Sequence, residues 1–264
     1  MDNRPIGVFD SGIGGLTVVK ELIRQLPNES IMYFGDLKRM PYGSRSKEEI
    51  IDFSLEISKF LISKNVKMIV IACNTATAYA VNILNDLLDI PVIGIIEYGA
   101  KLASEITKNN KIGIIATEAT IESGEYVKTI KQISELSVYT QKCPLLVPLI
   151  EREKYKNLDT ILKSYIEPLV AKNIDTLILG CTHYPIIKSK IEKLYSNLNI
   201  VDPASELVRN VKIILNKNDM LSENENSSYI FFLSSNKKRV KMRIHQILGI
   251  DNIIISEKDM ENDI

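Results

Sequence analysis

Two of the three cysteines in this 264-residue chain stand in similar surroundings. Cys73 follows the apolar run MIVIA, and Cys181 follows TLILG at an offset of 108 positions. Polar residues come directly after each thiol, Asn74 in one case and Thr182 in the other, and a purely apolar core position would not favour them. A thiol at the start of a helix is also expected to have a lowered pKa. We therefore interpret both cysteines as reactive thiols.

Other roles for the cysteines fit the sequence less well. Cys143 is followed by Pro144 and an apolar run, which indicates packing. Cys73, Cys181 and His183 could supply three zinc ligands, but neither C-x-x-C nor H-x-x-x-H spacing is present, and we expect no metal. A Cys–His pair for acyl transfer would leave the second thiol unexplained.

Two thiols that face one cleft from opposite sides suit proton transfer at a carbon acid. One removes a proton and the other delivers one to the opposite face, which inverts the carbon. Thiols, whose ordinary pKa is about 8.5, can serve as both base and acid. Asp10 and His183 are placed to assist the two transfers. The residues thus indicate a two-base racemase or epimerase, with a non-catalytic two-lobe amino-acid-binding protein as the alternative from another class.

The elements that must position these residues alternate between strands and helices, which is typical of parallel sheets covered by helices. Strands are predicted over 6–9, 31–34, 68–71, 92–95, 112–115, 137–141, 176–179, 200–201 and 229–233. Helices are predicted over 15–25, 47–64, 76–89, 99–109, 121–134, 158–172, 186–195 and 205–215. Beyond 233, a helix and a short apolar run at 253–255 are expected.

Four polar motifs fall at the carboxyl ends of predicted strands, where parallel sheets bind ligands. They are FDSGIGG, GDLKRMPYG, ACNTAT and GCTHYP. Free backbone N–H groups and hydroxyls at such ends suit a carboxylate. The glycines do not form a dinucleotide fingerprint, because Thr17 stands where that motif needs Gly or Ala.

The duplication extends beyond the cysteines. SKFLISKNVKMIVIACNT overlays IEPLVAKNIDTLILGCTH, and PIGVFDSG is similar to KIGIIATE. Two related, pseudo-symmetric α/β lobes are therefore expected, the first ending near Ile96 and the second near Pro203.

Composition indicates a globular protein without a specialised surface. The hydrophobic fraction is 45%, the charged fraction is 25%, and the formal net charge is zero, so we expect no nucleic-acid partner. No apolar run reaches the roughly 18–20 residues of a membrane span, and no signal peptide is evident, so we expect no membrane and a cytoplasmic location. A basic cluster is interpreted as a solvated helix face: Lys237, Lys238, Arg239, Lys241 and Arg243.

Together, IGVFDSGIGGLTV, GDLKRMPYG, ACNTATA and LGCTHYP resemble the glutamate racemases of the aspartate/glutamate racemase superfamily. The resemblance implies cofactor-independent interconversion of L- and D-glutamate, which supplies peptidoglycan synthesis and so maintains cell shape. It implies two flavodoxin-like lobes, 1–96 with 207–264 and 97–206, with the active site between them. It also implies a homodimer. Racemisation of another amino acid, such as aspartate, remains the alternative within this class, since one methylene changes binding by only about 1–3 kcal/mol.

The resemblance further assigns roles to individual residues. Cys73 matches the base for D-glutamate and Cys181 the base for L-glutamate. Glu151 falls where the family has an assisting carboxylate. Substrate contacts are implied for Asp10, Ser11, Tyr42, Gly43, Asn74, Thr75, Thr117, Thr182 and His183.

Overall fold

In the computed structural model, which describes residues 1–235, 237–250 and 252–260, the strands form two separate sheets. The first has the order β10-β9-β2-β1-β3-β4 and the second β6-β5-β7-β8, and every strand pair is parallel. The strands are β1 Ile6–Asp10, β2 Ile31–Gly35, β3 Met68–Ile71, β4 Val92–Gly94, β5 Lys111–Ala116, β6 Ser137–Lys142, β7 Thr176–Gly180, β8 Asn199–Val201, β9 Tyr229–Leu233 and β10 Ile254–Glu257.

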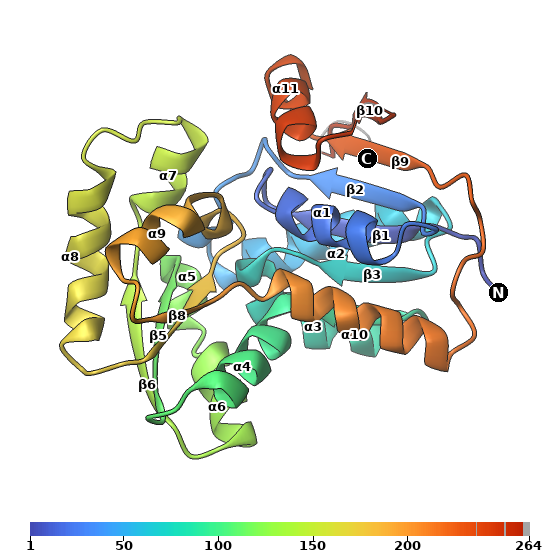
Figure 1. The fold of residues 1–264 in the computed structure, drawn as a ribbon. Coiled ribbons are helices and arrows are strands. Elements are labelled where there is room, and N and C mark those ends of the chain that lie inside the picture. The colour runs from blue at the N-terminus through green and yellow to red at the C-terminus, as the bar shows by residue number, and fades with distance from the viewer. Residues whose placement is uncertain (236, 251, 261–264) are drawn as a thin grey trace.

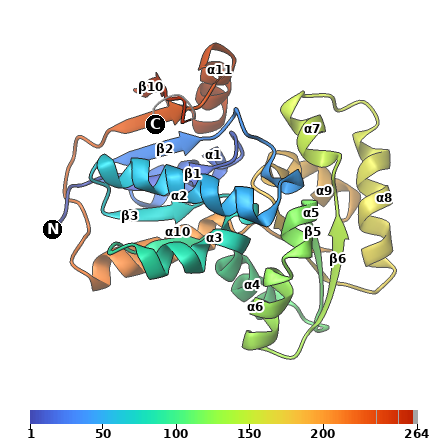
Figure 2. The ribbon, with the colours of Figure 1, turned by 180° about the vertical axis from the view of Figure 1, so that it is seen from behind.

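Helices cover both faces of each sheet (Figures 1 and 2). They are α1 Leu16–Gln25, α2 Lys47–Ser63, α3 Asn74–Leu87, α4 Ile95–Ile106, α5 Glu118–Glu122, α6 Glu125–Ile133, α7 Leu146–Glu151, α8 Leu158–Val170, α9 Lys188–Leu194, α10 Ala204–Lys217 and α11 Lys237–Leu248. Two short 3-10 turns, Tyr42–Ser44 and Tyr184–Ile187, begin within the last two residues of the second and fourth polar motifs.

The side-chain alternation of buried strands builds a core on each face of the first sheet. Ile6 and Val8 of β1 pack with α1, α10 and α11, whereas Phe9 packs with α2 and α3. The second sheet repeats this plan: Ile114 of β5 packs with α4 and α6, and Ile115 packs with α7, α8 and α9. These two all-parallel sheets confirm the predicted α/β fold class.

Strand membership supports the predicted lobes without fixing their limits. The tail strands β9 and β10 extend the first sheet beside β2, so the chain returns to its first half after building the second sheet. Helix α10 packs on α1 and α4, at the junction of the two halves. The lobe limits, 1–96 with 207–264 and 97–206, stay a prediction.

Local departures from the predicted elements have local causes. The helix predicted over 121–134 is two helices, because Gly124 adopts φ +66° between α5 and α6. Ile95 begins α4 instead of ending a strand, so the helix predicted over 99–109 starts four residues earlier. Helix α7 was missed because prolines flank and enter it. Pro148 lies in its first turn, where a missing N–H costs no hydrogen bond.

Candidate active site

The carboxyl ends of β1, β3, β5 and β7 bring the predicted residues together. Twelve residues from both halves of the chain line a small cavity there: Ser11, Pro41, Tyr42, Gly43, Cys73, Asn74, Thr75, Thr117, Val147, Cys181, Thr182 and His183. Asp10 and Glu151 stand behind this lining and bond to Thr182 and His183, respectively. The two thiols therefore reach one cavity from two different sheets.

The cavity is almost closed. The volume that the centre of a water molecule can occupy is about 20 Å³. This is room for little more than one water. Cys73 and Cys181 are 5% and 7% exposed. An amino acid the size of glutamate needs more room than this volume provides.

Cys73 is the N-cap residue of α3, and its Sγ accepts a hydrogen bond from the backbone N–H of Ala76 at 3.4 Å. Its thiol also lies 3.7 Å from Oγ of Ser11, to which it donates. Burial, followed by the negative charge of Asp10, raises the pKa of Cys73 to about 12. The expectation of a lowered pKa is therefore wrong for Cys73, because desolvation outweighs the helix terminus.

Cys181 has a different environment, with a charged partner. Its Sγ lies 3.7 Å from Nδ1 of His183, whose Nε2 lies 2.6 Å from Oε1 of Glu151. Burial alone would lower the pKa of His183, but hydrogen bonds with Cys181 and Glu151 raise it to about 10. At neutral pH, His183 is thus an imidazolium that donates to the carboxylate of Glu151. One thiol is held protonated and the other is paired with a cation.

Asp10 organises the turn after β1. Its Oδ2 accepts hydrogen bonds from the backbone N–H groups of Gly15 at 2.8 Å and Gly12 at 3.3 Å. Thr182 Oγ1 donates to Oδ1 of Asp10 at 3.2 Å, which links the two halves of the chain. No hydrogen bond joins Asp10 to Cys73 within the described residues, so Asp10 acts on Cys73 through its charge.

Two residues that the sequence analysis missed lie behind the cavity lining and bond to polar residues in it. The hydroxyl oxygens of Thr75, Thr117 and Thr120 form a triangle. Each pair of these oxygens is 2.9 Å apart, within hydrogen-bonding distance. Tyr126 donates to Oδ1 of Asn74 at 2.7 Å. The T-x-x-T spacing of Thr117 and Thr120, which places both on one face of a helix, was the available signal; nothing local points to Tyr126.

The amide of Asn74 has an open donor. Its Nδ2 is buried and has no hydrogen-bond partner within the described residues, although its Oδ1 is bonded. A buried donor without a partner costs free energy, which a substrate carboxylate in the cavity would recover. This geometry supports the substrate contact that was predicted for Asn74.

Tyr42 lines the cavity, and its hydroxyl is already engaged because it donates to Oδ2 of Asp36. Arg39 bonds the same oxygen at 2.6 Å, so it is a buried structural cation rather than a cavity-lining one. Gly43 lies so close to Thr117 that an added Cβ would be 2.5 Å from the Cβ of that residue. Gly43 therefore offers a substrate only its backbone groups.

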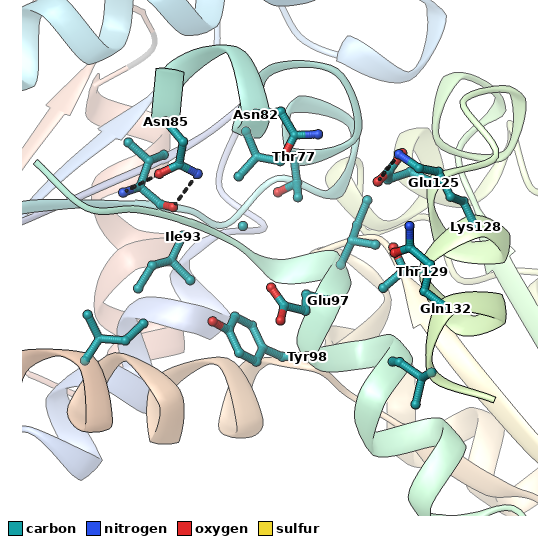
Figure 3. Close-up of a pocket in the computed structure, with 16 residues that line it drawn as sticks. Thr77, Asn82, Asn85, Ile93, Glu97, Tyr98, Glu125, Lys128, Thr129 and Gln132 are labelled. Carbon is teal, nitrogen blue, oxygen red and sulfur yellow. Dashed lines mark hydrogen bonds and ion pairs between the residues drawn. The ribbon is translucent and has the colours of Figure 1, made fainter. Parts of the chain in front are cut away.

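A larger cavity, of about 580 Å³, lies elsewhere (Figure 3). Residues of α3, α4 and α6 line it, and none of the predicted site residues does. Its polar side chains are partly engaged with their own surroundings: Asn85 bonds the backbone of Val92, and Lys128 pairs with Glu125. It holds no thiol, so the proton-transfer chemistry belongs to the smaller cavity.

In the part of the chain that the structure describes, no three His, Cys, Asp or Glu side chains are grouped as a metal ion would require. Nor does any helix in that part have the length and apolar character needed to span a membrane.

Comparisons with known proteins agree with this geometry. Residues 6–211 match the Asp/Glu/Hydantoin racemase family, and the chain belongs to that family. Within it, the relatives are glutamate racemases. That of Lactococcus lactis subsp. cremoris (strain SK11) is 45% identical over 99% of this chain and 98% of its own length.

Solved structures give the same result. The glutamate racemase of Bacillus anthracis aligns with a TM-score of 0.94 at 40% identity, covering 98% of both chains. That of Francisella tularensis, solved with D-glutamate, has a TM-score of 0.92 at 39% identity and 99% coverage of both. An aspartate racemase of Picrophilus torridus shares the fold alone, with a TM-score of 0.58 at 20% identity.

Proposed function

We propose that this protein is a glutamate racemase that interconverts L- and D-glutamate with two cysteines and no cofactor. The observation that carries the proposal is the pair of thiols, Cys73 and Cys181, that line one cavity from two different sheets. A binding protein needs N–H groups and hydroxyls for an amino acid, but it has no use for two thiols in unlike protonation environments.

In the L-to-D direction, the Cys181 thiolate removes the Cα proton of L-glutamate. The electron pair of the broken C–H bond is held on the substrate carboxylate as an enediolate. The Cys73 thiol then donates its proton to the opposite face of Cα. The enzyme ends with Cys181 protonated and Cys73 ionised, which is the form that converts D-glutamate back.

The difficult step is removal of a weakly acidic proton, and preorganised donors must stabilise the charge that develops on the carboxylate. Nδ2 of Asn74 and the hydroxyls of Ser11, Thr75 and Thr182 line the cavity and can supply this stabilisation. The His183 imidazolium places a positive charge beside the sulfur of Cys181. The Glu151 carboxylate, which bonds Nε2 of His183, favours that protonated form.

Glutamate is favoured over aspartate because the glutamate racemases align over nearly the whole chain at about twice the identity. The decisive experiment incubates the purified protein in D₂O with each enantiomer of glutamate and aspartate, with no added cofactor. Deuterium at Cα, followed by NMR, and loss of optical rotation are expected with both glutamates. Exchange only with aspartate would contradict the substrate assignment, and binding without exchange would contradict catalysis.

Three further parts of the proposal concern the cell and the assembly. D-Glutamate made here would enter peptidoglycan synthesis, in the cytoplasm, and the protein would act as a homodimer. Sedimentation velocity tests the last point: a mass near twice the 29.8 kDa of one chain is expected, and a species of one chain's mass at assay concentration would contradict it.

A further inference from the structure

Arg243 of α11 does not lie on the solvated face that its basic neighbours predicted. Lys241, two residues earlier, is exposed, whereas the side chain of Arg243 is only 12% exposed. The side chains of 237–239 lie outside the described residues. Burial of a long cationic side chain costs free energy unless it gains partners, so the contacts of Arg243 show what it does.

The guanidinium of Arg243 binds the end of α7. Nη1 donates to the backbone carbonyl of Glu151 at 3.0 Å, and Nη2 donates to that of Ile150 at 3.4 Å. Both carbonyls belong to the last turn of the helix. That of Ile150 also accepts from the backbone N–H of Glu153 at 3.2 Å, so Arg243 adds a second donor there. A cation at this position also complements the negative end of the helix dipole.

The same guanidinium faces the acidic side chains at this helix end. Nη1 lies 3.7 Å from Oε2 of Glu151, and Nε lies 3.6 Å from Oε1 of Glu153. The other oxygen of Glu151, Oε1, is the one that accepts from His183 at 2.6 Å. A continuous chain of polar contacts therefore runs from Arg243 through Glu151 and His183 to Cys181.

This chain crosses from one half of the molecule to the other. Val240, Ile244 and Leu248 anchor α11 in the core of the first sheet. Glu151 and Cys181 belong to elements that pack around the second sheet. A small cavity of about 170 Å³, lined by Met40, Glu151 and Arg243 among others, lies where these parts meet.

We propose that Arg243 is a positioning residue that fixes the end of α7, holds the Glu151 carboxylate against His183, and so supports proton transfer at Cys181 rather than at Cys73. The inference rests on the proposed racemase function. Without the guanidinium, the carboxylates of Glu151 and Glu153 would lose the cation that lies near both of them, and Glu151 would lose a contact that holds it beside His183.

Racemisation itself cannot reveal an effect on one thiol, because equal energies of the enantiomers force equal kcat/KM in both directions. A one-way reaction can. In 3-chloroglutamate, a thiolate removes the Cα proton, the Cβ–Cl bond breaks, and chloride leaves with its electron pair. The resulting enamine hydrolyses to 2-oxoglutarate and ammonia. Cys181 would act on the L enantiomer and Cys73 on the D enantiomer.

The test measures 2-oxoglutarate release from both enantiomers by wild type, Arg243→Met, Arg243→Lys and Lys241→Met. In Arg243→Met we expect elimination from the L enantiomer to fall about tenfold or more, and from the D enantiomer less than about threefold. Arg243→Lys should fall between wild type and Met, since lysine keeps the charge but cannot bond two carbonyls with one planar group. Lys241→Met, which removes an exposed charge from the same helix, should match wild type.

Equal loss with both enantiomers, no loss with either, or the same change in Lys241→Met would overturn the inference. If Arg243→Met does not fold, as judged by circular dichroism, Arg243→Lys decides: an unchanged L-to-D ratio contradicts the proposal. Failure of the proposed function is distinguishable, because wild type would then exchange no Cα proton of glutamate in D₂O.

Discussion

At the scale of single residues, the two thiols are alike in sequence and unlike in structure. Cys73 is buried beside the charge of Asp10, while Cys181 is paired with an imidazolium. In the proposed mechanism, these unlike surroundings suit Cys181 to accept the Cα proton of L-glutamate and Cys73 to donate its own proton to the opposite face.

The requirement for both thiols gives the first prediction. Cys73→Ser and Cys181→Ser should each lower racemisation by about 10²–10⁴-fold, since a serine hydroxyl is a poor base at neutral pH. Elimination from 3-chloroglutamate should survive for the L enantiomer in Cys73→Ser and for the D enantiomer in Cys181→Ser. Wild-type racemisation in either variant would exclude the two-base mechanism.

The ion pair of His183 predicts a pH-dependent stability. The pKa of His183 is about 10 in the folded protein against an ordinary 6.5, so folding favours the protonated form. The stabilisation is complete below 6.5 and is lost as pH rises through about 10. The difference in Tm between wild type and Glu151→Gln should therefore be largest below pH 6.5 and shrink toward pH 10. A difference that grows over that interval would contradict a raised pKa.

The hydrogen bond between Tyr126 and Asn74 predicts an effect on binding. Tyr126→Phe removes the donor to Oδ1 of Asn74 and leaves that buried acceptor unpaired, at a cost of about 1–3 kcal/mol. The amide should lose its fixed orientation, so KM for glutamate should rise more than kcat falls. Steady-state kinetics checks this, and an unchanged KM would show that Asn74 does not contact the substrate.

At the scale of elements, the turn between β1 and α1 sets how closely the two halves approach. A Cβ added to Gly14 would lie 2.4 Å from Oγ1 of Thr182 and 2.7 Å from Nδ1 of His183. Only glycine fits there without displacing the residues beside Cys181. The glycine at position 14 therefore allows the turn after β1 to lie close to the residues that follow β7. It is not needed here to bind a phosphate.

Gly14→Ala should push the second half away from the first and lower kcat/KM by about tenfold or more, because a displacement of about 1 Å can cost 10²-fold. Gly12→Ala is the matched comparison: its added Cβ would lie at ordinary contact distances, 3.5 Å from Sδ of Met40 and 3.8 Å from Cε1 of His183, and the loss should be much smaller. Kinetics and circular dichroism of both variants provide the check. Similar losses in the two would argue against the steric explanation.

At the scale of the whole molecule, the tail returns to the first sheet and is fastened by a buried ion pair. Lys67 Nζ lies 2.6 Å from Oε2 of Glu29 and also donates to the backbone carbonyls of Asp2 and Met220. Oε1 of Glu29 accepts from the N–H of Ser222. These contacts join the N-terminus, the start of β3 and the segment that leads to β9.

Lys67→Met should lower the free energy of unfolding by about 3–5 kcal/mol, because it leaves the buried Glu29 carboxylate without its cation. Lys128→Met removes a largely exposed pair with Glu125 and should cost less than about 1 kcal/mol. Urea unfolding of both variants measures the difference. Equal midpoints would show that the buried pair does not hold the tail.

The sequence by itself determined the α/β class, nearly all of the strands, and the identity of the two thiols. These are local properties: alternation of apolar runs fixes strands and helices, and polar residues directly after a strand mark the binding edge of a parallel sheet. The duplicated context of Cys73 and Cys181 added the chemistry, since both thiols had to reach the same edge of similar units.

Only the tertiary structure decided how unlike the two thiols are and which distant residues serve them. The pKa of Cys73 depends on burial and on the charge of Asp10, and neither can be read from its neighbours in the chain. Thr120, Tyr126 and Arg243 reach the site from elements whose packing sets their direction. Solvation and through-space charge depend on the complete fold, and for that reason the sequence predicts which thiols react but does not determine the charges around them.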